Sequence, residues 1–122
     1  MKQLVLVLTL CILSFQVKSS SFEEIERAAS ALEGQAQLAY LHEQTENINQ
    51  LPLLEQVKFW HMLGMSQDVN AMTQDAYDSF TKAITLFEEN NLPLSPELPL
   101  AYIERSYMTY ILTYDTEQVL NS

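Results

Sequence analysis

The chain contains two histidines, and one of them has a carboxylate at helical spacing. His42 and Glu46 are four residues apart, so a helix would place both side chains on one face. His61, from a later segment, could then complete a metal site of two histidines and a carboxylate. The helical zinc-protease motif, however, needs a second histidine where Glu46 stands. A surface histidine beside glutamates is the commoner case, so the sequence predicts neither a metal nor another cofactor.

Other catalytic arrangements are also missing from the sequence. The single cysteine, Cys11, lies in an apolar N-terminal run, and no serine stands in a Gly-x-Ser-x-Gly elbow. Gly34 and Gly64 are the only glycines, so there is no glycine-rich phosphate loop. Acidic pairs such as Glu23-Glu24 are plentiful, but acid–base catalysis needs carboxylates with shifted pKa values in a cleft. We expect solvated carboxylates here, and a protein that is not an enzyme.

The first 20 residues have the layout of a secretory signal peptide. Lys2 precedes an apolar run over residues 4–13, and small polar residues follow it. The run is about half as long as the 20 or so apolar residues that a membrane-spanning helix needs. We expect cleavage near Ser19, with residues 1–19 as signal peptide and residues 20–122 as one domain that is not inserted in a membrane. An uncleaved N-terminal anchor is the alternative.

The cysteine count indicates the compartment of the mature chain, and the charge indicates which classes of partner it would bind or repel. Cleavage would remove Cys11, and a small exported domain without cysteine fits a Gram-negative periplasm better than an animal secretion route, although secretion stays open. Loss of Lys2 and Lys18 would leave four basic side chains against sixteen acidic ones, a net charge of −12. Such a surface repels nucleic acid and anionic lipid, and it favours basic proteins or peptides. The simpler reading is that the acidity only aids solubility.

Beyond residue 20 the apolar side chains recur with a helical period and hardly ever alternate as in a strand. The first stripe ends before Gly34, which is a natural turn between two short helices. The second stripe covers residues from about 35 to 49, and one long bent helix is the alternative. Pro52 ends this segment and starts the third helix.

Boundary residues also separate the later helices. The fourth stripe covers residues 72–87, with Thr73 as the expected N-cap. A loop over residues 90–96 follows, in which we expect Ser95 to cap the last helix and Pro96 to occupy its first position. Whether the last helix breaks near residues 113–116 stays open. The sequence therefore predicts an all-α fold of five or six helices, arranged as an antiparallel array of helix hairpins.

One helix pair has a signature of its own. The segment from about 57 to 90 resembles a tetratricopeptide repeat (TPR), a helix–turn–helix unit of 34 residues. Six of the eight signature positions are filled in register, by Trp60, Leu63, Gly64, Ala76, Phe80 and Ala83. The other two positions depart from the signature, since Gln67 replaces a tyrosine and Glu88 a proline. The resemblance implies a TPR-like α-solenoid fragment whose flanking helices are degenerate repeats or caps. It also implies a concave groove for a peptide, lined by the first helix of each pair.

Aromatic side chains are the candidate binding groups. Four tyrosines crowd the last helix, and tyrosine is enriched at interfaces, although they could instead cover the core at a wet boundary. Phe59 is next to Trp60, and a helix with one buried stripe cannot bury both on the same partner, so one of them would face a groove. The candidate binding residues are therefore Phe59, Tyr102 and Tyr107.

These observations lead to one expected function and to one alternative. We expect an exported, non-enzymatic module for protein–protein interaction, an adaptor or scaffold that binds a peptide or a protein segment. The alternative is an inhibitor or immunity-type protein that masks a basic site on a secreted enzyme or toxin. A homo-oligomer is also open, because a chain with one clear repeat could stack its incomplete end on a second copy.

Overall fold

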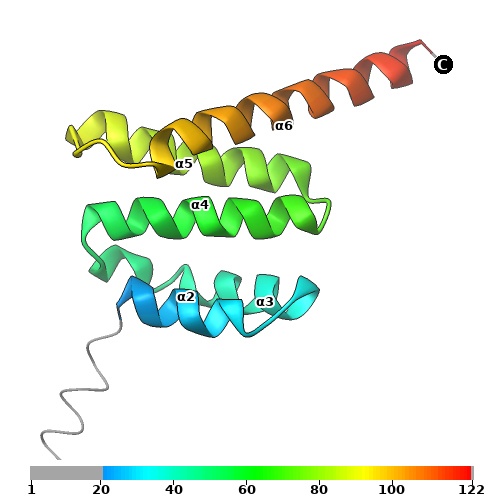
Figure 1. The fold of residues 1–122 in the computed structure, drawn as a ribbon. Coiled ribbons are helices and arrows are strands. Elements are labelled where there is room, and N and C mark those ends of the chain that lie inside the picture. The colour runs from blue at the N-terminus through cyan, green and yellow to red at the C-terminus, as the bar shows by residue number, and fades with distance from the viewer. Residues whose placement is uncertain (1–20, 122) are drawn as a thin grey trace, which may run out of the picture.

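The structure, a computed structural model, describes residues 21–121 and contains only helices there. The expected signal peptide, residues 1–19, lies outside the described residues. In chain order the elements are α2 (Phe22–Ser30), α3 (Gly34–Gln44), the short 3-10 helix η1 (Ile48–Gln50), α4 (Leu53–Val69), α5 (Thr73–Asn90) and α6 (Glu97–Leu120). Successive helices run antiparallel and stack, with the α2–α3 pair on one side of α4, and α5 and α6 on the other (Figure 1). The predicted all-α hairpin array is confirmed.

The central helix, α4, is apolar on more than one side because it packs in two directions. Phe59 and Leu63 belong to a buried cluster with residues of α2 and α3, such as Ile25. Val57 belongs to a second buried cluster with α5 and α6, around Phe80. α4 therefore joins the two halves of the array.

The α4–α5 hairpin depends on a close approach at Gly64. A Cβ atom built on Gly64 would stand 2.7 Å from a ring carbon of Phe80, so only a glycine lets the ring lie against α4 here. Ala76, Phe80 and Ala83 of α5 have no exposed surface, whereas Leu63, the residue before Gly64, is buried in the cluster with α2 and α3. The indole-bearing helix and the alanine-spaced helix thus lie side by side, as their spacing predicts.

The first two helices are separate, and the second is shorter than expected. α2 ends at Ser30, and Gly34 has a φ of +56°, which confirms a turn there rather than one bent helix. α3 ends at Gln44 and not near residue 49. The reason is local, since the Thr45 hydroxyl donates to the backbone oxygen of His42 at 2.7 Å and competes with further helical hydrogen bonds.

Two predicted caps are wrong. Thr73 is already the first residue of α5, and Met72 precedes it without a side-chain cap. α4 ends in a Schellman turn in which the Met72 N–H donates to the Gln67 oxygen at 2.8 Å, and this turn fixes the start of α5 without a capping side chain. Ser95 does not cap α6 either, because its hydroxyl accepts no backbone N–H hydrogen bond within residues 21–121.

The last helix begins one residue later than predicted, at Glu97, and Pro96 lies just before it. α6 is a single helix to Leu120, which settles the open question of a break, and it continues past the end of the α4–α5 hairpin (Figure 1). It packs on α5 through Ala101 and Met108, which are buried.

Candidate functional site

Two open cavities lie on opposite faces of α4, because the α4 residues that line them differ by about half a turn of the helix. We call them the acidic pocket and the tryptophan pocket. The acidic pocket has a volume of about 580 Å³, and the tryptophan pocket about 500 Å³. Both volumes fall within the range of ordinary ligand sites.

The acidic pocket is lined by three helices that are not neighbours in the chain, α2, α4 and α6. Its lining residues are Phe22, Glu23, Glu26, Glu55, Lys58, His61, Met62, Met65 and Glu97. Four of these side chains are carboxylates, and only Lys58 and His61 can carry positive charge. The pocket therefore combines a negative rim with an apolar wall.

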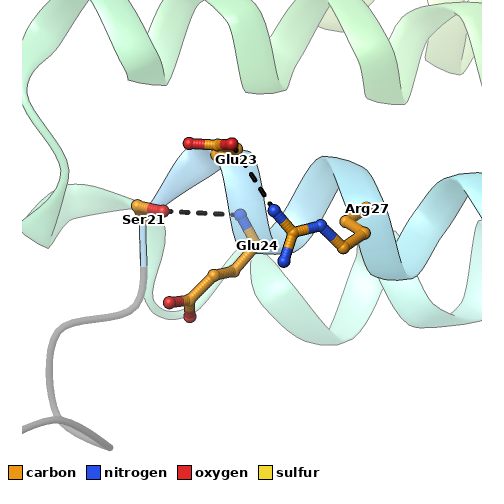
Figure 2. A network of polar contacts seen from close by, with 4 residues as sticks. All are labelled: Ser21, Glu23, Glu24 and Arg27. Carbon is orange, nitrogen blue, oxygen red and sulfur yellow. Dashed lines mark hydrogen bonds and ion pairs between the residues drawn. The ribbon is translucent and has the colours of Figure 1, made fainter.

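The first turn of α2 places two of the carboxylates. The Ser21 hydroxyl accepts a hydrogen bond from the Glu24 N–H at 3.4 Å and so caps the helix (Figure 2). Glu23 forms an exposed ion pair with Arg27 at 3.5 Å, one turn further along (Figure 2). Phe22 is buried against the body of the protein, and this anchors α2 with Glu23 and Glu26 at the pocket edge.

Two polar atoms at the pocket are buried without a partner. His61 Nε2 and Glu97 Oε2 form no hydrogen bond within residues 21–121. Buried polar groups are normally paired, so each unpaired one needs an explanation. The polar groups of this pocket are therefore less fully paired than Ser79 and Gln67 of the tryptophan pocket.

The pKa values of these two groups reflect the same surroundings. Burial lowers the pKa of the His61 imidazole below its ordinary value, and the nearby carboxylates of Glu97 and Glu104 offset this only in part. Burial alone would raise the pKa of Glu97, but the Ser95 hydroxyl, its own backbone N–H and the charges of Lys58 and His61 outweigh it, so the pKa is lowered. At neutral pH the pocket therefore holds a neutral His61 imidazole beside the ionised carboxylate of Glu97.

This arrangement suits a long cationic side chain. The thioethers of Met62 and Met65 offer a flexible apolar surface for an alkyl stem. The carboxylates of Glu55 and Glu97 offer acceptors for an ammonium or guanidinium head. An apolar wall for an alkyl stem and acceptors for a charged head thus lie in the same cavity.

The arrangement does not suit a metal ion. Over the part of the chain that the structure describes, no group of three or more His, Cys, Asp and Glu side chains is placed to hold one. His42 and His61, which the sequence could have brought together, line different cavities on opposite faces of α4. The constellation of His42, Glu46 and His61 is therefore not formed.

Four residues that line the tryptophan pocket contact one another in two pairs. The Lys82 ammonium lies 4.2 Å from the centre of the Trp60 ring, which is a cation–π contact. The Ser79 hydroxyl donates to Gln67 Oε1 at 2.6 Å, and both side chains are buried. These contacts join side chains of α5 to side chains of α4, so we assign them a structural role.

The three predicted binding residues are in different places, and none lines either cavity. Phe59 has no exposed surface and packs edge-on against Trp60, and of the two it is Trp60 that lines the tryptophan pocket. The Tyr102 hydroxyl donates to the Glu88 carboxylate, and this hydrogen bond raises the pKa of Tyr102. Tyr107 is 54% exposed on α6.

Sequence reasoning missed the acidic pocket. Glu26, Glu55 and Glu97 are far apart in the chain, and single glutamates on helices are ordinary surface residues. A signal existed only in combination. Glu26 and Glu55 are on the first helices of predicted pairs, where the resemblance implies a groove, and Glu97 is at the start of the last predicted helix.

Comparisons with known proteins give no further guidance. Family models, curated proteins and solved structures were all searched, and none matches this chain. Between residues 21 and 121, none of the helices has the length and hydrophobicity needed to cross a bilayer.

Proposed function

We propose that this protein is an exported, non-enzymatic interaction module of TPR-like architecture that binds a basic segment of another protein in its acidic pocket. The observation that carries the proposal is the composition of the pocket on the α2, α4 and α6 face. The pocket is lined by four carboxylates, two methionines and His61, and one imidazole nitrogen of His61 and one carboxylate oxygen of Glu97 are buried without a partner among residues 21–121.

The position of the pocket supports this proposal. A TPR-like array presents the first helix of each pair to its concave groove. α2 and α4 are the first helices of the α2–α3 and α4–α5 pairs, and α6 follows them in the same alternation. The pocket lies across these three helices and not across α3 or α5. A peptide that followed this face would meet every carboxylate of the pocket.

The charge of the chain supports a basic partner. Sixteen acidic side chains against six basic ones steer cationic partners toward the protein and repel anionic ones. The pocket repeats this imbalance locally, with four acidic side chains against one lysine. Binding is then expected to weaken as salt screens the long-range attraction.

The proposal is tested by pull-down from periplasmic extract at low and at high salt. The pocket variant replaces Glu26 and Glu55 with lysine. Its matched control replaces Glu43 and Glu46 with lysine, which makes the same change in net charge on exposed side chains away from the pocket. We expect a partner that is retained at low salt by the wild type and by the control, and lost by the pocket variant.

Two results would overturn the proposal. One is that no protein is retained under either salt condition. The other is equal loss from the pocket variant and the control, which would assign binding to net charge rather than to the pocket.

A further inference from the structure

α6 exposes a continuous row of large apolar side chains that the rest of the fold does not cover. We call this row the α6 stripe. Its members and their exposed fractions are Leu100 45%, Ile103 62%, Tyr107 54%, Tyr110 65% and Tyr114 50%. The steps between them are three, four, three and four residues, which is the 3.5-residue repeat of two helices that pack along each other.

The stripe is distinct from the face by which α6 packs on its own chain. Ala101 and Met108 are buried against α5, and they lie about a third of a turn away from the centre of the stripe. The side chains of Tyr110 and Tyr114 stack on each other, with ring centres 6.2 Å apart and planes at 23°. The exposed aromatic surface is thus ordered before any partner arrives.

We propose that the α6 stripe is a homodimer interface, covered by the same stripe of a second copy of this chain. A two-fold interface needs a patch that complements itself, and a straight row of apolar residues at coiled-coil spacing does so.

The area fits this occupant. If a large side chain offers about 200 Å² of surface, the five exposed fractions amount to about 550 Å² on each chain. The largest apolar patch on a typical monomer is about 300–600 Å² and is often functional, so this stripe lies at the upper end of that range. Two facing stripes would remove about 1,100 Å² from solvent, which is just above the threshold for a specific interface.

The charges near the stripe also fit a second copy. Between Leu100 and Tyr114 the only charged side chains are Glu104 and Arg105. Glu104 lies near enough to His61 of α4 to act on its pKa, and the Arg105 guanidinium lies 5.4 Å from the Tyr102 ring. Neither belongs to the stripe, so two stripes can meet without burying like charges.

The test measures molar mass by sedimentation equilibrium at protein concentrations from about 1 to 500 µM. The full chain is expressed, and the protein is purified in whatever processed form the host cell produces. We expect a concentration-dependent rise from monomer to dimer, and a tighter dimer at high salt because the two copies carry net charge of the same sign. This salt response is opposite to that of a basic partner in the acidic pocket, so the two proposals can fail independently.

Variants locate the interface. Replacing Ile103 and Tyr110 with glutamate is expected to raise the dimer dissociation constant by about tenfold or more, since buried unpaired carboxylates are costly. The control replaces Thr109 and Thr113 with glutamate on the polar side of the same helix, where both residues are exposed, and should change the constant by no more than about twofold. Far-UV circular dichroism checks that both variants fold.

A cysteine provides an independent measurement. In a chain with Cys11→Ser, the variant Tyr107→Cys at the centre of the stripe should form a disulfide-linked dimer under mild oxidation, and Thr109→Cys should not. A monomer at every concentration overturns the proposal, and so does a dimer that both glutamate variants weaken equally.

Discussion

Replacing Gly64 with alanine tests the packing of the α4–α5 hairpin. The new Cβ would stand 2.7, 2.9 and 2.9 Å from three carbons of the Phe80 ring, whereas packed carbons prefer about 3.5–4.0 Å. The ring or a helix axis must therefore move by about 1 Å. Phe80 has no exposed surface, so the ring has no solvent-filled space to move into.

Two opposing terms set the size of the effect. Overpacking a core costs about 1–3 kcal/mol, and the lack of free space at Phe80 favours the upper part of that range. Alanine in place of glycine within a helix contributes about 1 kcal/mol of stability in the other direction. We therefore expect Gly64→Ala to lower the free energy of unfolding by about 1–2 kcal/mol.

The assay is urea unfolding followed by far-UV circular dichroism. Ala39→Gly, at an exposed position inside α3, calibrates the propensity term in this protein. Phe80→Leu leaves a smaller side chain opposite Gly64, so Gly64→Ala should be better tolerated in that background, with a coupling of about 1 kcal/mol. If Gly64→Ala instead stabilises the protein by about 1 kcal/mol, as in an isolated helix, then α4 and α5 do not meet as described.

Three further predictions concern turns, caps and pH. Ala71 has a φ of +62° in the Schellman turn after α4, so Ala71→Gly should raise the free energy of unfolding by about 0.5–1 kcal/mol. The control Ala31→Gly, at a C-cap with right-handed φ and ψ, should not raise it, and urea unfolding measures both variants. Ser21→Ala should lower stability by about 1 kcal/mol and speed amide exchange at Glu24, and unchanged exchange would contradict the cap. Burial lowers the folded-state pKa of His61, so the unfolded state binds its proton first, and stability should fall as the pH drops below about 6.5 toward the folded pKa. This part of the pH profile should be absent in His61→Gln, and an NMR titration of His61 that gave a pKa at or above 6.5 would refute the assignment.

Much of the fold follows from local sequence signals. The break at Gly34, the start of α4 after Pro52 and the α4–α5 hairpin follow from the left-handed φ of a glycine, the geometry of proline and the size of the residues that face each other. The boundaries that sequence reasoning missed have causes that only the folded chain shows. At Thr73, for example, the preceding Schellman turn fixes the helix start, and it contains an alanine in a conformation that usually takes glycine.

The site could not be predicted in the same way. A pocket across α2, α4 and α6 depends on how far each helix is shifted and rotated against the next, and no local pattern gives these values. At the aromatic pair, both residues suit either side of α4, and only the packing of α2 and α3 decides that Phe59 is buried and Trp60 faces a cavity. The residues of the α6 stripe recur at helical spacing in the sequence, but spacing alone does not decide whether they cover the core or face solvent. Ala101 and Met108 occupy the inner side of α6, which leaves the stripe exposed.

Site-specific photo-cross-linking in cells tests most directly whether the acidic pocket binds a protein partner. A photoreactive phenylalanine analogue is placed at Met65, which lines the pocket, or at Val69, which is more exposed on the same helix but outside the pocket. We predict an adduct with another protein from Met65, its loss when Glu26 and Glu55 are replaced with lysine, and none from Val69. No adduct from Met65, or equal adducts from the two positions, would contradict the account.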